Sequence, residues 1–465
     1  LVSLVSQYMV GRFHINFIYI EFIGAYSERT VYLFSILTVT VNDNIKFLII
    51  FFLSVGQVLL LIGGFNWWVD PYDIYHPAKY KSNDLVWMSK QLRLAKAYKV
   101  KQLRPQGIVI GASTSQLGIN PNHPGWSENV YPRYNLALPG ANLYESFRYF
   151  QHSHALNRPK QVLIGLDFVS FNIFSQLSDD FDESYMIVSR KGKRQDHYLN
   201  NLAVTLFSLS ATKASQKKMF YRGKGTHLSN GTEFSEEIDS QPRNNRSAMM
   251  WSATKFVSRL LMPPPSHRFC LDDETQVSSS FQYLRQILKT TKESKADVRL
   301  FIQPIHVYLL EVLKVMGLME DYEKWQYRLI DLVEDVDNKY PENKKFPLWD
   351  FSGYNSVTMD EVPPEEEPKG PMDWYYDVAH FKKSLGDMIQ DRIFNYNDAG
   401  RVVPEDFGMQ INSKNIDLYQ FEQKNKQMQY MLAHQEDIQE LSGKVNSVKK
   451  KIKEFDCGEI DTRKS

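Results

Sequence analysis

Apolar residues are most concentrated in one long run near the start of the chain, Phe47–Val69, which contains no charged residue. Gln57 is its one strongly polar residue before the Asn-Trp-Trp sequence near its end. A helix of about 20 apolar residues crosses the roughly 30 Å hydrocarbon core of a bilayer, and tryptophan is typical of the membrane interface. The pattern therefore predicts a transmembrane anchor over residues 45–69. A buried core helix and a cleaved signal peptide are the alternatives, and the length and late start of the run disfavour both.

Two shorter apolar patches precede this run, around Ile15–Tyr26 and Val31–Val41. Glu21 and the shortness of the second patch argue against further membrane spans. Because the chain does not begin with Met, residues 1–44 are treated as an N-terminal segment of uncertain origin, a fragment or an upstream translation. We assign no structure to them.

Residues 70–104 form the predicted juxtamembrane connector. They leave the anchor through a proline-containing loop, and their spacing predicts an amphipathic helix over Asn83–Lys99 with its basic residues on the outer side. Such a basic face is either solvated or in contact with anionic lipid headgroups. The Lys and Arg counts on the two sides of the anchor are nearly equal, so charge does not set its orientation.

From Gln106 onward, short apolar runs alternate with segments of helical periodicity. This alternation is typical of a parallel sheet covered by helices on both faces. The fold class predicted for residues 105–395 is α/β, a three-layer αβα sandwich with a mainly parallel five-stranded sheet. The predicted strands are Gly107–Ile110, Tyr134–Leu138, Gln161–Phe168, Asp297–Pro304 and Phe346–Phe351, and the predicted helices are Leu143–Leu156, Ser280–Glu293, Val307–Met316, Met319–Lys339 and Phe381–Phe394.

The alternation lapses over residues 175–268, which are predicted to be an insertion with some helix around Tyr198–Ala211 that lies over the active face. Its basic run Arg190–Arg194 is either a solvated loop or a contact for an anionic polymer or lipid surface.

Residues 396–465 are predicted to form a helical tail. Seven-residue spacing favours a coiled coil, and self-association through 428–455 and packing back on the parent domain are equally supported. The repeating positions are Met431, Ile438, Val445 and Ile452, and Leu441, Val448 and Phe455.

Composition adds limits on the chemistry of the 465 residues. The net charge of +1 gives no argument for a nucleic-acid partner, and the hydrophobic content of 43% indicates a real core. Cys270 and Cys457 are the only cysteines and lack metal-ligand spacing, so neither a metal nor a cofactor is predicted, although the two could form one disulfide.

Three polar residues form a candidate catalytic set from the two ends of the α/β region. Ser113 ends the first strand and its small-residue turn, and Asp377 and His380, three residues apart, stand at the start of the last helix. A histidine can act as general base toward a serine while an aspartate orients its ring. A helix-capping aspartate beside a surface histidine is the simpler alternative for an isolated Asp-x-x-His.

The second and third strands end in candidate oxyanion groups. A backbone N–H freed in the glycine loop Gly140-Ala-Asn142 can donate to a developing negative charge. The third strand ends in Gly165-Leu-Asp167, and Asn172 follows. All these loops gather at the carboxyl edge of a parallel sheet, where open α/β folds bind ligands.

The order of these motifs resembles the SGNH (GDSL-like) hydrolase superfamily, and more narrowly its membrane-anchored members of the alginate O-acetyltransferase type and the DltD-like proteins. The resemblance covers 106–395 without the insertion, and the anchor. It implies Ser113 as nucleophile, His380 as base, Asp377 as its orienting carboxylate, and the backbone N–H groups of Gly140 and Ser113 as oxyanion donors.

The chain departs from the family pattern at two positions. Ala112 stands where the superfamily has Asp, and Asp167 stands where the third block has an asparagine side-chain donor. An ionised carboxylate only accepts hydrogen bonds. Either Asp167 has another role and Asn142 or Asn172 donates instead, or the site is weak. Ser115, two residues beyond Ser113, is the alternative nucleophile.

The resemblance implies a serine acyltransferase or esterase acting on O-acyl groups of cell-envelope or exported polysaccharide. Its domain would lie on the outer side of the cytoplasmic membrane, and a multi-span membrane protein would supply the acyl group. The alternative is a non-catalytic anchored scaffold of the same fold that binds polysaccharide or an assembly partner. The departure at Asp167 and the heptads of the tail favour this alternative.

Overall fold

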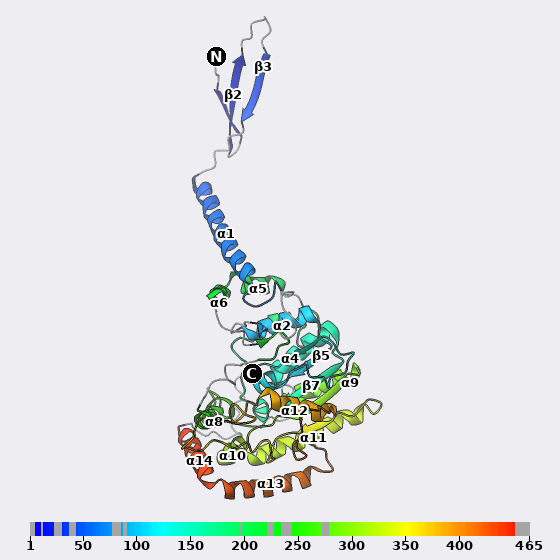
Figure 1. The fold of residues 1–465 in the computed structure, drawn as a ribbon. Coiled ribbons are helices and arrows are strands. Elements are labelled where there is room, and N and C mark those ends of the chain that lie inside the picture. Colours follow the sequence, from blue (N-terminus) through cyan, green and yellow to red (C-terminus); the bar gives the residue numbers. More distant parts are fainter. Residues whose placement is uncertain are drawn as a thin grey trace.

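Figure 1 shows the fold, taken from a computed structural model of the chain. The structure describes residues 5–10, 13–22, 30–36, 43–76, 85–86, 91–195, 197–220, 227–233, 244–271 and 279–451.

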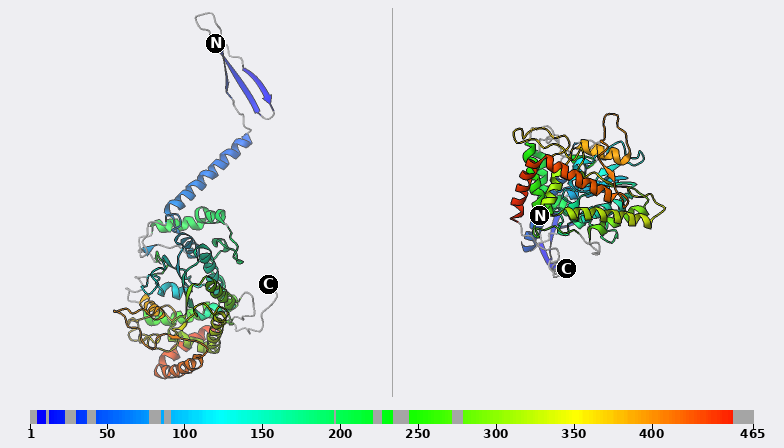
Figure 2. Two further views of the ribbon diagram at one scale, coloured as in Figure 1. Left: turned by 90° about the vertical axis from the view of Figure 1, so that its right-hand side faces the viewer. Right: turned by 90° about the horizontal axis from the view of Figure 1, so that it is seen from below.

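The N-terminal part consists of one long helix preceded by three strands. Helix α1, Asp43–Val69, is exposed along nearly all its length and stands away from the main body (Figures 1 and 2). Among the described residues it is the one helix long and apolar enough to cross a membrane. The strands, to which the sequence assigned no structure, form an antiparallel sheet: β1 Val5–Val10, β2 Phe13–Phe22 and β3 Thr30–Ile36.

The main sheet has six strands in the order β11-β10-β9-β7-β5-β6. Five of them are parallel, as expected, but β11 pairs antiparallel with β10 through two residues, so the sheet is mixed and not five-stranded. Residues 409–410 belong to no apolar run that would predict a strand. Both are exposed, and they join the sheet by pairing with β10. The bounds are β5 Gly107–Ile110, β6 Arg133–Asn135, β7 Gln161–Leu166, β9 Asp297–Ile302, β10 Leu348–Asp350 and β11 Met409–Gln410.

Counted along the chain, the five parallel strands lie in the spatial order 2-1-3-4-5. The chain leaves β5 toward β6 on one side, whereas β7 pairs with β5 on its other side. At such a switch point the two outgoing loops separate and leave a crevice at the carboxyl ends of the strands, where open α/β sheets bind ligands. The loops after β5 and β7 are those that carry Ser113 and Asp167.

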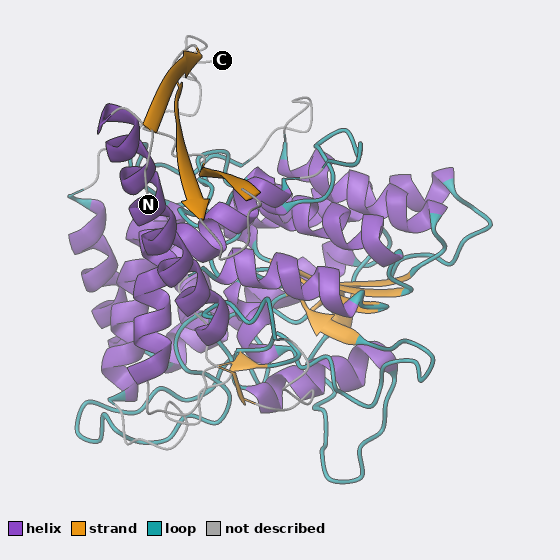
Figure 3. Cartoon of the chain, turned by 90° about the horizontal axis from the view of Figure 1, so that it is seen from above, coloured by secondary structure: helices purple, strands orange, loops and turns teal. Residues whose placement is uncertain are grey.

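Helices surround the strands, as Figure 3 shows from above. All residues of β5 and β7 are buried, so both faces of the sheet centre are covered. Helices α9 to α11 and strand β5 have the bounds that the sequence predicted. The helices that follow strands or close the domain are α3 Ser113–Gly118, α4 Leu143–Asn157, α9 Ser280–Glu293, α10 Val307–Met316, α11 Met319–Lys339 and α12 Lys383–Phe394, with the short turn η2 Phe168–Phe171 after β7.

The connector helix differs from its prediction. Helix α2 covers Leu92–Leu103, not Asn83–Lys99; within 77–90 only β4, Leu85–Val86, is described. Its basic side faces inward, because Arg93, Lys96 and Lys99 are all buried. Each cation is compensated: the ammonium of Lys99, for example, lies 2.9 Å from a carboxylate oxygen of Asp73. Helix α2 is therefore part of the core and offers these cations neither to solvent nor to lipid.

The insertion divides into two parts with different neighbours. The π-helical turn η4 and helix α6 contact α1, and α5 packs on η4, so the predicted helix around 198–211 lies beside the anchor and not over the cavity. The second part, α8 and the π-helical turn η5, borders the cavity described below, whereas the basic run 190–194 is an exposed turn. The bounds are η3 Glu183–Tyr185, α5 Tyr198–Leu202, η4 Ala203–Phe207, α6 Leu209–Phe220, β8 His227–Leu228, α8 Asn245–Phe256 and η5 Val257–Leu261; β8 pairs with β4.

The tail packs back on the domain. Helices α13, Ile416–Ala433, and α14, Gln435–Lys449, follow β11, and the heptad residues Leu441 and Val445 are buried where α14 contacts α10 and α8. Of the two alternatives for these apolar positions, the structure therefore describes packing within the chain; self-association stays a prediction. Ile452, Phe455 and Cys457 lie outside the described residues, and Cys270 is disulfide-bonded.

Candidate active site

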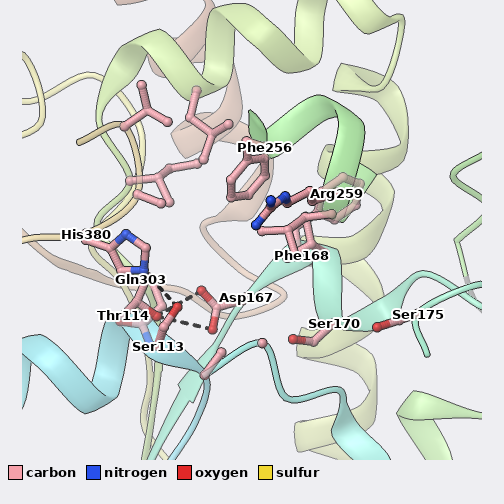
Figure 4. Close-up of a pocket in the computed structure, with 18 of the residues that line it drawn as sticks. Ser113, Thr114, Asp167, Phe168, Ser170, Ser175, Phe256, Arg259, Gln303 and His380 are labelled. Atoms are coloured by element: carbon pink, nitrogen blue, oxygen red, sulfur yellow. Dashed lines mark hydrogen bonds between the residues drawn. The ribbon is translucent and has the colours of Figure 1, made fainter. Parts of the chain in front are cut away.

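Ser113 is placed at the carboxyl edge of the sheet by a turn that only small residues permit. Strand β5 ends at Ile110, and α3 begins at Ser113. A Cβ on Gly111 would collide with the side chain of Ser115, so glycine is required where the turn passes this side chain. The Ser113 Oγ lies 2.8 Å from the Nε2 atom of His380 (Figure 4).

Asp377 and His380 come from a tight loop before α12. Asp377 Oδ1 accepts the backbone N–H groups of Ala379 and His380, both at 2.9 Å, and its Oδ2 lies 2.8 Å from His380 Nδ1. Because an ionised carboxylate is only an acceptor, Nδ1 carries the proton, and Nε2 of the neutral ring accepts from the serine hydroxyl. The structure thus brings the three residues into a Ser-His-Asp hydrogen-bonded chain.

The charges of Asp377 and His380 in this hydrogen-bonded triad stabilise each other. Burial by itself would lower the pKa of His380, but the hydrogen bond and charge of Asp377, helped by Asp167 and Glu233, raise it above its usual value. Burial likewise opposes ionisation of Asp377, yet the His380 contact and two backbone N–H groups hold the pKa of Asp377 below its usual value. For His380 to act as a general base, Asp377 must be ionised and the imidazole must bind a proton readily, and both pKa shifts favour this.

Ser115, the alternative nucleophile, points elsewhere. Its side chain is fully buried, and its hydroxyl lies 2.5 Å from the Nε2 of Gln303, behind the loop. Residues two apart on a helix are separated by about 200° around its axis. Ser113 therefore faces His380 while Ser115 faces the sheet.

Gly140 reaches the cavity at the end of β6. Its φ of 63° is in the left-handed region, which favours glycine, and it lines the same cavity as Ser113. Two buried cations of α2 hold the segment before it. Lys96 Nζ donates to the carbonyls of Asn135 (3.0 Å) and Ala137 (2.5 Å), and Arg93 donates to the carbonyl of Pro139 (2.9 Å). Burial, as the largest cause, lowers the pKa of Lys96 to about 7.

Asp167 follows β7 and organises the nucleophile loop. It accepts a hydrogen bond from the Thr114 hydroxyl at 3.1 Å and one from the Ala112 backbone. Burial raises the pKa of Asp167 to about 6, although Thr114 and the charge of His380 oppose this. Its role here is that of an acceptor, as its chemistry requires, and not that of an oxyanion donor.

Asn142 and Asn172 are used elsewhere. The Asn142 side chain caps α4 by accepting from the Glu145 N–H at 3.0 Å, and its Nδ2 donates to the Ser175 carbonyl at 3.3 Å. Asn172 Nδ2 donates to the carbonyls of Leu261 and Arg268. Neither lines the cavity. The expectation that one of these amides replaces the missing donor does not agree with this geometry, because backbone groups of neighbouring loops already occupy both.

A cavity of about 510 Å³ opens from Ser113. Many of the residues that line this cavity were not predicted from the sequence. Apolar residues of 249–261 recur at three- to four-residue intervals, which could have predicted the α8–η5 segment. Gln303 at the end of β9 carried no signal. The missed lining residues include Thr114, Trp251, Lys255, Phe256, Arg259 and Gln303.

No protein-family model matches this chain, and no curated protein matches it.

Proposed function

We propose that this chain is a membrane-anchored serine acyltransferase or esterase of the SGNH type, acting on O-acyl groups of cell-envelope or exported polysaccharide. The observation that carries the proposal is the hydrogen-bonded chain from Ser113 through His380 to Asp377 at the switch point of the sheet. The mainly parallel sheet, buried on both faces at its centre, agrees with the three-layer architecture proposed with it. The anchor and an outer-side location are proposed together with it.

The proposed reaction uses the Ser-His-Asp contacts and, as the resemblance implies, two backbone N–H groups as oxyanion donors. As Ser113 Oγ attacks the acyl carbonyl carbon, His380 Nε2 takes the hydroxyl proton, and the backbone N–H groups of Ser113 and Gly140 stabilise the oxyanion. The ester C–O bond then breaks, and His380 returns the proton to the leaving alcohol. Water or an acceptor hydroxyl next attacks the Ser113 ester, giving its proton through His380 back to Oγ.

The test is covalent labelling of the full-length chain in detergent with a fluorescent fluorophosphonate, which reacts with activated serines. Wild type and Ser115→Ala are expected to label, and Ser113→Ala is not, because of these two serines it is Ser113 whose hydroxyl contacts His380. An unlabelled wild-type chain, or labelling that survives Ser113→Ala, contradicts the serine mechanism.

A non-catalytic scaffold of the same fold is the second candidate. It is favoured by Asp167, since a carboxylate occupies the position of the usual donor and neither nearby asparagine amide reaches the cavity. Losing one oxyanion donor typically costs about 10²–10³ in rate. The labelling experiment separates the two, because a scaffold needs no reactive serine.

A further inference from the structure

The cavity beside Ser113 has polar groups at its catalytic end and a few more along its wall, among them Ser170, Ser252, Lys255 and Arg259. Thr114, Asp167 and His380 lie around the serine hydroxyl (Figure 4). The remaining wall is mainly apolar and comes from η2, from α8 with η5, and from α10 with α11. Its apolar lining residues include Phe168, Val169, Trp251, Phe256, Leu260, Ile305, Leu309, Leu313, Tyr322 and Trp325.

The aromatic part of this wall is rigid. The Phe168 ring lies 5.6 Å from that of Trp325 and 5.3 Å from that of Tyr322, measured between centroids. The Tyr322 hydroxyl is turned to Ser352 at 2.7 Å, so it does not add a polar group to the cavity. Protein interiors rarely leave voids larger than a water molecule, and a preformed apolar cavity of this size is typical of a ligand site.

Resting on the proposed function, we infer that this cavity holds the hydrocarbon chain of a medium-length acyl group esterified to Ser113. At about 30 Å³ for each water-sized group, an acetyl group fills a small part of the cavity, whereas roughly eight to twelve carbons fill most of its apolar part. Trp251 and Leu260 are exposed and continue the apolar wall to the rim. Arg259 also lines the cavity, and Figure 4 shows its guanidinium between the side chains of Phe256 and Phe168.

The test is the chain-length dependence of hydrolysis by the full-length protein in detergent, with p-nitrophenyl acetate, butyrate, octanoate and decanoate. We expect kcat/KM to rise on the order of 10²-fold from acetate to octanoate, because each buried methylene favours the longer ester about fourfold before ordering costs. Val169→Trp, which fills the cavity from η2, is expected to collapse the octanoate-to-acetate ratio. Val402→Trp, at an exposed residue outside the cavity, should leave this ratio unchanged.

The wild-type series decides the inference even if Val169→Trp does not fold. Hydrolysis that is fastest for acetate overturns the acyl-chain site and leaves the serine mechanism in place. No hydrolysis at any length, with no fluorophosphonate labelling, overturns the proposed function and the inference together.

A second feature lies at the end of α1. Helices α5 and α6 run across the end of α1 that meets the main body (Figures 1 and 2). The joint is polar and buried: the Asn66 amide donates to the Leu206 carbonyl at 2.6 Å, and Ser215 donates to Asn66 at 2.8 Å. Phe207 packs directly on Gly63, where a Cβ would collide with its ring.

The opposite side of this pair is unusually apolar. Leu199 is 77% exposed, Leu209 79% and Phe220 74%. Lys213 and Lys217 on α6 are exposed too, and so are the two tryptophans that end α1. Exposed leucine and phenylalanine beside lysine are characteristic of helices that lie in a membrane interface.

We infer that α5, η4 and α6 form an interfacial platform that rests in the bilayer surface. The length of α1 supports this. Counted from Phe47, where the uncharged run begins, residues 47–66 span about 30 Å, the thickness of the hydrocarbon core, so the end of α1 from Gly63 to Val69 lies at the boundary of the core. The platform contacts this last segment, at the depth where interfacial helices bury their apolar side chains.

The test places an environment-sensitive NBD fluorophore on an introduced cysteine of the full chain in phosphatidylcholine–phosphatidylglycerol vesicles. Cys270 is disulfide-bonded and does not compete for the label. At Leu209→Cys we expect blue-shifted emission and quenching by doxyl-labelled lipid. The control, Leu432→Cys, is also exposed but lies on α13 at the far end of the molecule, and its label should stay in water. Equal emission and quenching at the two positions overturns the platform.

Discussion

Replacing Ser113 or His380 with alanine is expected to lower kcat/KM for a p-nitrophenyl ester by about 10⁴–10⁶, and replacing Asp377 by about 10⁴. Each substitution breaks the same hydrogen-bonded chain, in which both contacts measure 2.8 Å. Residues that act as one unit have effects that do not multiply. The double variant Ser113→Ala/His380→Ala should therefore be no slower than either single variant.

Steady-state kinetics of the full-length chain in detergent provide the measurement. Ser447→Ala, on an exposed face of α14, is the matched control and should keep the wild-type rate. If the effects of Ser113→Ala and His380→Ala multiply, or if Ser113→Ala loses less than tenfold, these residues do not form a catalytic unit. Either kinetic result would contradict the proposed function, as labelling that survives Ser113→Ala would.

Arg93→Ala is expected to lower the free energy of unfolding by about 3–5 kcal/mol, the usual effect of breaking a buried ion pair. Arg93 Nε donates to Glu145 at 2.6 Å and Nη1 donates to Asp180 at 2.9 Å, and both Arg93 and Glu145 are almost completely buried. The substitution also frees the Pro139 carbonyl just before Gly140. Removing the guanidinium leaves the Glu145 charge buried without its partner.

Thermal unfolding of the detergent-solubilised chain measures this effect. Lys101→Ala, on the exposed side of the same helix, should change stability by less than about 0.5 kcal/mol. Burial already raises the pKa of Glu145, with Arg93 as the main opposing influence, so without Arg93 the carboxyl binds a proton more readily. The deficit of Arg93→Ala should therefore shrink as the pH falls from 8 to 5. A deficit like that of Lys101→Ala contradicts the assigned role of Arg93.

Local pattern accounted for much of the fold. The helices 280–293, 307–316 and 319–339 and the strand 107–110 could be predicted to the residue, because each repeats its apolar positions with the period of its own secondary structure. The edge strand β11 could not, since its two exposed residues carry no such period and it exists only through pairing with β10.

The buried face of α2 was beyond local reasoning for a different reason. Sequence alone assigns Lys and Arg to the outer side of an amphipathic helix, because burying a charge without a partner is costly. The partners that make burial acceptable, among them the carbonyls of Asn135 and Ala137 and the carboxylate of Glu145, come from segments about 40 to 50 residues away. Only the packed chain shows that they meet.

By itself, the sequence determined the membrane-length helix, the α/β alternation and the set of polar residues at strand ends, because these depend on neighbours along the chain. The tertiary structure decided which of those residues meet. Ser113 and His380 are 267 residues apart in sequence, and the strand order that separates the loops after β5 and β7 leaves Ser113 in the crevice that His380 enters. The tertiary structure also places the Ser115 side chain in the core and pairs the Asn142 and Asn172 amides with loop carbonyls. These directions depend on the groups that pack around each side chain.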